Sequence, residues 1–134
     1  MTLDADQNAF LAAHRWALIA TISPSLRPQV TMVAYYWDGH DIILSTKRTT
    51  TKWANVVHHR EICITVTDGE QCLSVYGLGE AIDTDPDRAR LTDRLLASLL
   101  PEHAAILAAD IDEGLDATDR VIVRLTPQRA VGRI

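Results

Sequence analysis

Apolar residues recur along this chain with two different periods, and the changes between these periods divide it into helices and strands. Strands are indicated by short runs that are β-branched, apolar or alternating. The predicted strands cover residues 16–22, 29–37, 41–46, 61–67, 71–82 and 120–126. Helical spacing is found in residues 4–14, 51–59 and 85–99, and in a second short helix that follows Pro101. The predicted order is therefore helix, three strands, helix, two strands, two helices and a last strand.

Residues at the helix ends and along the helix faces support this division. Asp4 and Gln7 have the spacing of a capping box. Asp85 can cap a helix whose first residue is Pro86. The residues expected on the buried sides are Trp53, Val56 and Val57 in the second helix, Leu91, Leu95, Leu96 and Leu99 in the third, and Ile106 and Leu107 in the fourth.

Turn signals indicate how the strands are joined. The pairs Asp38-Gly39 and Asp68-Gly69 tolerate positive φ and favour tight hairpin turns. Gly77 and Gly79 lie inside a predicted strand and indicate a bend or bulge. Six strands with tight turns and few long crossovers favour a small antiparallel barrel over a doubly wound fold. We therefore predict a mostly β chain of the α+β class with flanking helices.

Composition and charge narrow the range of partners. The 134 residues, 47% of them hydrophobic, suit one domain that spans residues 1–134. The net charge of -5 argues against general nucleic-acid or anionic-membrane binding, so small molecules or a second copy of the chain are expected. Neither a membrane-spanning run nor a signal peptide is recognisable, which predicts a cytoplasmic protein. Cys63 and Cys72 are expected to be reduced core thiols, because no CxxC spacing is present.

One segment, residues 45–55, is basic although the chain as a whole is acidic. It places three cations and five hydroxyl groups between a predicted strand and a predicted helix. Free N–H groups at the helix start would favour an anion, and Lys47, Arg48 and Lys52 would add charge-assisted hydrogen bonds. We predict a phosphate site here; the alternative is a solvated basic loop.

Six segments match a known fold family in order, over about residues 10 to 83. They are Ala20-Thr21-Ile22, Arg27-Pro28-Gln29-Val30, Val33-Ala34-Tyr35-Tyr36-Trp37, Leu44-Ser45-Thr46, Lys52-Trp53-Ala54-Asn55-Val56 and Tyr76-Gly77-Leu78-Gly79-Glu80-Ala81. On these residues the chain resembles the pyridoxamine 5′-phosphate oxidase-like superfamily, and within it the short deazaflavin (coenzyme F420)-dependent reductases. The resemblance implies a six-stranded antiparallel split β-barrel, the FMN-binding split barrel, with flanking helices.

The resemblance also implies a homodimer whose cofactor lies in a groove between two barrels. Lys52 would contact the cofactor's phosphate, and the strand from Pro28 to Met32 would follow the edge of its ring system. The cofactor-binding residues expected on this basis are Pro28, Gln29, Val30, Thr31, Met32, Ser45, Thr46, Lys47, Arg48, Thr50, Thr51, Lys52 and Asn55. The family often has Arg two residues before the matching Lys. This chain has Thr50 there, and Arg48 or Lys47 could supply the charge.

The expected activity is an F420H2-dependent reductase that transfers a hydride from reduced deazaflavin to an unsaturated small molecule. Such a cofactor needs no catalytic triad, and the sequence contains no GxSxG, HExxH or Walker motif. No catalytic residue is identified. The conceivable proton donors are Tyr35, Tyr36, Tyr76 and His103. A metal site is not expected, because the adjacent His58 and His59 diverge by about 100° on a helix.

Two other functions stay open. The same fold could bind FMN, either to oxidise a pyridoxamine-phosphate-like substrate or to reduce flavin, or it could be a non-catalytic carrier of flavin or haem. The polyglutamate tail of F420 would need a basic channel, for which Lys47, Arg48 and Arg60 are candidates, whereas FMN ends at its phosphate. Arg129 and Arg133 follow the last predicted strand and form either a mobile tail or an approach to the partner's cofactor.

Overall fold

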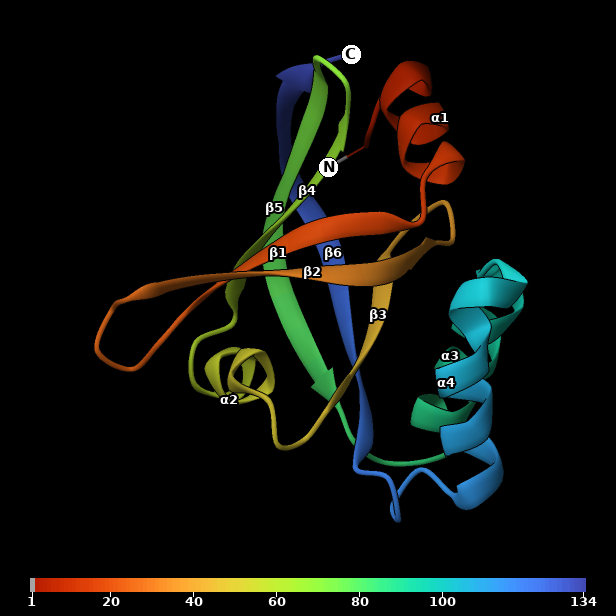
Figure 1. Cartoon of the computed structure of the whole chain (residues 1–134). Coiled ribbons are helices and arrows are strands. Elements are labelled where there is room, and N and C mark those ends of the chain that lie inside the picture. The colour runs from red at the N-terminus through yellow and green to blue at the C-terminus, as the bar shows by residue number, and fades with distance from the viewer. Residues whose placement is uncertain (1) are drawn as a thin grey trace.

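The computed structural model describes residues 2–134, and its six strands close into an antiparallel barrel in the order β1-β2-β3-β6-β5-β4 (Figure 1). The strands are β1 (Trp16–Ile22), β2 (Pro28–Trp37), β3 (Ile42–Lys47), β4 (Glu61–Asp68), β5 (Gln71–Ile82) and β6 (Arg120–Arg133). The helices are α1 (Ala5–Ala13), α2 (Thr51–His58), α3 (Asp87–Ser98) and α4 (Pro101–Glu113). The predicted fold class and order of elements are confirmed. Within the described residues, no helix has the length and apolar character that a membrane span needs.

Local signals explain where several elements begin and turn. The Asp4 carboxylate accepts the Gln7 N–H at 2.8 Å, and the Gln7 side chain accepts the Asp4 N–H at 3.0 Å, so the predicted capping box starts α1. At the β2–β3 hairpin the Asp38 carboxylate accepts two backbone N–H groups of the turn, and Gly39 has a φ of 92°. The tight turn expected there is present.

The main hydrophobic core fills the barrel. Alternate strand residues point inward, as the pleat requires, and Ile19, Leu44 and Val75 are almost completely buried. Tyr35 lies in the same core, and its hydroxyl donates to the Leu11 carbonyl at 2.6 Å. This bond fastens α1 to the barrel. Burial raises the pKa of Tyr35 well above its ordinary value, so the phenol stays neutral.

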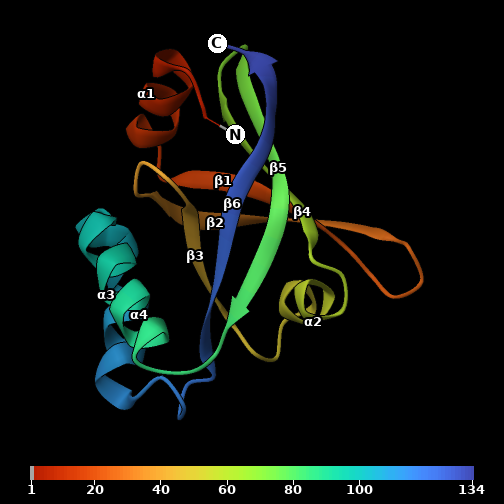
Figure 2. The same cartoon turned by 180° about the vertical axis from the view of Figure 1, so that it is seen from behind.

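A second, smaller apolar cluster lies outside the barrel, beneath α3. Ile43 of β3 and Ile122 of β6 are fully buried there, together with Ile82 and Leu91. Figure 2 shows α3 and α4 side by side next to β3, while α2 lies near the far end of that strand. The helices therefore cover one outer side of the barrel and leave another uncovered.

The last strand is longer than predicted. It continues past Thr126, so Arg129 and Arg133 pair with β5 and do not form a mobile tail. The register of this long pairing shifts between Tyr76 and Gly77, which confirms the irregularity predicted from the glycines. A Cβ at Gly77 would collide with the Thr126 carbonyl, so the close approach of the two strands requires glycine there.

Two predicted helix faces are partly wrong. Val57 is exposed, whereas Trp53, Asn55 and Val56 of the same helix are buried. In α4, Leu107 is buried but Ile106 is exposed. The apolar residues are few in α2 and lie on several sides of α4, so in both helices the pattern leaves the rotation open and packing decides which of them is covered.

The start of α3 and the two cysteines also differ from expectation. α3 begins at Asp87, one residue after Pro86, although the Asp85 carboxylate still accepts a backbone N–H of the first turn. Cys63 and Cys72 are free thiols, but they are half-buried in the barrel wall and do not belong to the core.

Candidate functional site

A cleft of about 370 Å³ opens where β2, β3 and the start of β6 meet α3 and α4. Its polar lining consists of Ser45, Thr46, Lys47, Thr50, Lys52, His103 and Arg120. Its apolar lining includes Trp16, Met32, Leu95, Leu99, Ile106 and Leu107. A cationic side next to an apolar wall suits a ligand that carries both an anionic group and a ring system.

Hydroxyl groups shape the cationic side. The Thr50 hydroxyl accepts the Trp53 N–H at 3.3 Å and donates to the Lys47 carbonyl at 2.8 Å, so it caps α2 and closes the turn before it. The hydroxyls of Thr46 and Thr50 lie 2.9 Å apart, and the Lys52 ammonium donates to Thr46 at 3.5 Å. Several residues of the predicted phosphate loop are therefore brought together at the start of α2.

The cations of the cleft are not fully compensated. Lys52 is half-buried and pairs with no carboxylate in the described part of the chain. Burial, and to a smaller extent the Arg120 guanidinium, lowers the pKa of Lys52. Arg120 donates to Asp110 at 2.8 Å, and the Lys47 ammonium lies 3.8 Å from the same carboxylate. Three cations thus face one carboxylate, and the excess of two positive charges favours an anion.

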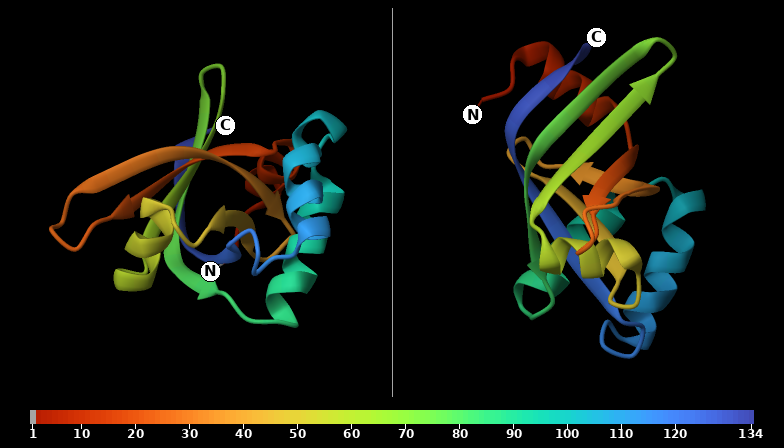
Figure 3. Two further views of the ribbon diagram at one scale, coloured as in Figure 1. Left: turned by 60° about the horizontal axis from the view of Figure 1, so that its bottom comes forward. Right: turned by 90° about the vertical axis from the view of Figure 1, so that its left-hand side faces the viewer.

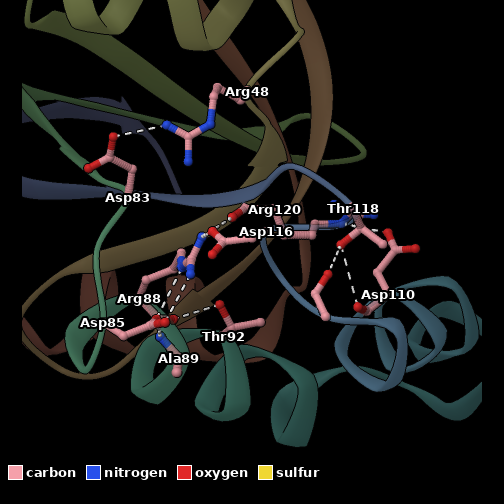
Figure 4. Close-up of polar contacts among 11 residues, drawn as sticks. Arg48, Asp83, Asp85, Arg88, Ala89, Thr92, Asp110, Asp116, Thr118 and Arg120 are labelled. Carbon is pink, nitrogen blue, oxygen red and sulfur yellow. Dashed lines mark hydrogen bonds and ion pairs between the residues drawn. The ribbon is translucent and has the colours of Figure 1, made fainter.

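Two predicted basic contacts lie elsewhere. Arg48 pairs with Asp83 at 3.0 Å, away from Arg120 and Asp110 (Figure 4). Arg60, a candidate for the tail channel, donates to the Gly79 carbonyl at 3.3 Å. Neither arginine lines the cleft. The cations that accompany Lys52 are Lys47 and Arg120.

Asn55 and Gln29 belong to a polar chain between α2 and the barrel. Asn55 is 2% exposed, and its amide donates to the Thr21 hydroxyl at 3.1 Å. Thr21 in turn donates to the Gln29 side chain at 3.3 Å. These side chains attach α2 to β1 and β2. Thr51, at the start of α2, is exposed and does not line the cleft.

The predicted ring-edge strand borders the cleft with one side chain. Met32 lines the cleft and lies on the outer face of the barrel, as does the exposed Val30. Thr31 points to the other face, where its hydroxyl is buried and has no hydrogen-bond partner in the described structure. Contacts of Pro28, Gln29, Val30 and Thr31 with a cofactor stay predictions.

Of the four conceivable proton donors, His103 is the one that lines the cleft. Its ring packs edge-on against Trp16, with 5.0 Å between the ring centroids. Tyr35 lies in the barrel core, and Tyr36 packs against the cluster beneath α3. Tyr76 lies under a guanidinium group on another part of the barrel wall. The fold therefore separates the three tyrosines from the cleft.

A buried arginine fixes the start of β6. Arg88 of α3 is 4% exposed and pairs with Asp85 at 2.9 Å and Asp116 at 2.8 Å (Figure 4). It also donates to the Arg120 carbonyl at 3.4 Å. The hydrogen bond from Arg88 is the main cause that lowers the pKa of Asp85, so this pair stays charged. Arg88 thereby holds the backbone from which the Arg120 side chain enters the cleft.

Sequence reasoning missed Arg120 and Asp110. No local pattern marks them, because Arg120 meets Lys47 only through the pairing of β6 with β3. Within residues 2–134, no group of three or more His, Cys, Asp or Glu side chains is arranged to hold a metal ion.

Comparisons with known proteins agree with this architecture. The family model described as pyridoxamine 5′-phosphate oxidase matches residues 3–132. A conserved hypothetical protein from Mycobacterium tuberculosis has a similar structure, with a TM-score of 0.76 and 21% identity over 98% of this chain and 84% of that one. A solved structure described as an F420 reductase has a TM-score of 0.68 and 27% identity over 92% and 94% of the two chains. The haem storage protein HutZ from Vibrio cholerae has a TM-score of 0.73 and 16% identity over 98% and 94%. No curated protein sequence matches the chain.

Proposed function

Because the chain belongs to the pyridoxamine 5′-phosphate oxidase family, we propose that it is an F420H2-dependent reductase of an unsaturated small molecule. The observation that carries this proposal is the cleft in which Lys52 adjoins an apolar wall, since Lys52 is a half-buried cation with no carboxylate partner among residues 2–134. The likeness to a structure described as an F420 reductase, at 27% identity over most of both chains, supports the choice of cofactor.

In this proposal the cationic side of the cleft holds the cofactor's phosphate. Lys47 and Lys52 would bind its oxygens together with the hydroxyl groups of Thr46 and Thr50. Met32 would pack against the ring system from β2. The reduced deazaflavin supplies the hydride when it is bound. The protein's own task is to orient the ring and to exclude water, for which the apolar residues of α3 and α4 are suited.

In the same proposal, His103 donates the proton that the substrate takes up together with the hydride. An imidazole N–H in the cleft can donate to a substrate atom that gains electron density, and the packing against Trp16 holds the ring in place. His103→Asn should then lower the rate of substrate reduction more than it lowers cofactor affinity.

A homodimer would complete the cleft. The exposed apolar residues Trp16, Leu18, Val30 and Met32 share the outer face of β1 and β2. A contiguous exposed apolar face of this kind is typical of an interaction surface. Trp16 and Met32 also line the cleft, so a second copy seated on this face would cover its open side.

The single-domain organisation and the cytoplasmic location stay predictions.

One observation favours FMN as the alternative cofactor. A phosphate monoester carries a charge of about -1.5 to -2 at neutral pH, which matches the excess of two positive charges among Lys47, Lys52, Arg120 and Asp110. The likeness to a haem storage protein, at 16% identity, concerns the fold alone.

The test is a titration of the purified apo-protein with F420, with FMN and with haem in parallel, at fixed salt, followed by quenching of tryptophan fluorescence. Tight binding of F420 with weak binding of FMN supports the reductase. The reverse preference moves the protein to the FMN alternative, and a Soret band with haem alone moves it to the carrier. Binding of none of them would contradict every redox proposal and leave the fold unaffected.

Lys52→Ala gives the sharpest check of the site. It should weaken cofactor binding by about 1.5–3 kcal/mol, the range for hydrogen bonds to charged groups, without unfolding the protein. Arg90→Ala is the matched control, because Arg90 pairs with Asp87 on the exposed surface of α3, outside the cleft. Equal affinities for wild type and Lys52→Ala would remove Lys52 from the site.

A further inference from the structure

Arg120 enters the cleft from a strand that the predicted phosphate loop does not include. It is the first residue of β6, it pairs in register with Lys47 of β3, and its side chain is 15% exposed. Its guanidinium donates to Asp110 at 2.8 Å and to the Ser45 hydroxyl at 3.5 Å. Because a guanidinium has five N–H donors, these two bonds leave donors free for another acceptor.

Asp110 of α4 is shared between two cations. Its carboxylate is 14% exposed and contacts both Arg120 and, at 3.8 Å, the Lys47 ammonium. One carboxylate cannot neutralise both, and Lys52 beside them has no carboxylate partner in the part of the chain that the structure describes. Uncompensated cations in a half-buried site are costly unless an anion joins them.

We propose that Arg120 is a direct ligand of the bound anion and that Asp110 is the counter-ion with which this anion competes. The inference rests on the proposed function, since the anion is the phosphate at the end of the cofactor's polyol chain. In the free protein Asp110 neutralises part of the charge of Arg120 and Lys47, and the bound phosphate takes over both cations.

This assignment gives the cleft an arginine, which the loop itself does not. Thr50, two residues before Lys52, is uncharged, and Arg48 is engaged with Asp83. Arg120 reaches the same cleft from β6, and its planar fork can bind two phosphate oxygens at once, which Lys47 and Lys52 cannot do.

A purely structural role is the competing explanation. The pair of Arg120 and Asp110 would then serve only to fasten α4 to β6. The two explanations differ in the sign of one effect. If the pair is structural, removal of either partner harms the site, whereas a competing counter-ion should oppose anion binding, so that its removal strengthens it.

The experiment isolates the phosphate by comparing ligands that differ only there. The dissociation constants of FMN and riboflavin, or of the 5′-phosphate of the F420 deazaflavin and the same deazaflavin without phosphate, are measured for each variant. The ratio of the constant for the phosphate-free ligand to that for the phosphorylated ligand reports the phosphate's contribution. Arg120→Gln should reduce this contribution by about 10- to 100-fold, and Arg120→Lys by less. Asp110→Asn should increase it by about 3-fold or more. Arg90→Gln, which removes an exposed cation outside the cleft, should leave it unchanged.

Two results would overturn the proposal: an unchanged ratio in Arg120→Gln, or a lower ratio in both Arg120→Gln and Asp110→Asn. Circular dichroism and thermal unfolding of each variant identify a variant that has failed to fold. If Arg120→Gln has failed, Arg120→Lys takes its place: a smaller contribution of the phosphate supports the proposal, and an unchanged one overturns it.

A failure of the proposed function is distinguishable from a failure of this inference. If neither FMN nor F420 binds the wild type, the cofactor proposal fails, and the anion site is tested with inorganic phosphate by NMR. The Arg120 Nε–H signal is identified by its absence in Arg120→Gln. A shift of that signal on addition of phosphate supports the ligand role, and an unmoved signal overturns it.

Discussion

The outer side of β3 and β6 and the outer side of β1 and β2 carry similar apolar residues but differ in what covers them. Ile43 and Ile122 are fully buried beneath α3. Val30 and Met32 are 56% and 67% exposed. Figure 3 shows α3 and α4 on one side of the barrel, while the β1–β2 hairpin projects from another.

The difference matters because the cleft lies along the border between the two faces. Leu95 belongs to α3, on the covered side, whereas Trp16 and Met32 belong to the uncovered face, and all three line the cleft. A barrel can bury its inner residues by itself, but an apolar outer face needs another element or another molecule. A helix of the same chain meets this need on one side, and we propose that a second copy meets it on the other.

The largest expected effect is on the covered face. Leu91 is 2% exposed and packs with Ile43 and Ile122 between α3 and the barrel. Leu91→Ala should lower the free energy of unfolding by about 2–5 kcal/mol, because it removes buried apolar contacts and leaves a cavity. Urea unfolding at a fixed protein concentration measures this. Val57→Ala, on the exposed side of α2, is the control and should change stability by no more than about 0.5 kcal/mol. If the two variants lost equal amounts of unfolding free energy, the packing of α3 on the outer side of β3 and β6 would not stabilise the protein.

The uncovered face should respond through association. Leu18 pairs with Met32 of β2 and Thr65 of β4, near the middle of this face. Leu18→Glu places a charge there and should weaken the homodimer by about 2 kcal/mol or more, which is about 30-fold in its dissociation constant. Sedimentation should then show the 14.8 kDa monomer at concentrations where the wild type is a dimer.

The control for this prediction is Val57→Glu, which adds the same charge at an exposed apolar residue of α2. It should leave association unchanged. Dilution should also lower the melting temperature of the wild type, since folding and association are then linked. A wild type that sediments as a monomer at every concentration would leave the cleft without a second copy.

An effect of intermediate size is expected at Asn55, which the sequence assigns to the cofactor and the structure buries. Asn55→Ala leaves the Thr21 hydroxyl without its amide donor and should cost about 1–3 kcal/mol of stability. Cofactor affinity per folded molecule should change less than in Lys52→Ala. The opposite result, a loss of affinity with unchanged stability, would make Asn55 a ligand.

The order of elements could be predicted because each element carries its own local signal. Period-2 runs mark the strands, and the capping box of Asp4 marks the first helix. The prediction ended the last strand too early because Pro127 interrupts its pattern. In the structure Pro127 lies opposite Gly77 at the shift of register, so the strand passes through this point and continues.

The candidate site could be predicted only where its residues are neighbours in sequence. Thr46, Thr50 and Lys52 belong to one loop, and their composition reveals the cationic side. Arg120 and Asp110 join them through the pairing of β3 with β6 and the packing of α4, which no local pattern encodes. The burial of Asn55 depends on the rotation of α2, and that rotation is a result of packing.

The smallest expected effect is beside the uncovered face, where His14 at the end of α1 contacts Asp68 at the end of β4. The His14 Nδ1 lies 2.7 Å from the Phe10 carbonyl oxygen, and its Nε2 lies 3.0 Å from the Asp68 carboxylate. Only the protonated ring can donate to both acceptors. The Phe10 carbonyl is the largest cause that raises the pKa of His14 above its ordinary value of 6.5, and Asp68 adds to it, while partial burial opposes both.

A raised pKa in the folded state means that His14 stabilises the protein fully below pH 6.5 and loses this contribution as pH rises through its folded pKa. His14→Gln should therefore cost more stability at pH 5.5 than at pH 8.5, with a difference of no more than about 1 kcal/mol because Asp68 is mostly exposed. Asp68→Asn retains the Phe10 contact and should reduce the pH dependence without abolishing it. If wild type and His14→Gln showed the same pH dependence of stability, the contacts of His14 with Phe10 and Asp68 would make no pH-dependent contribution to folding.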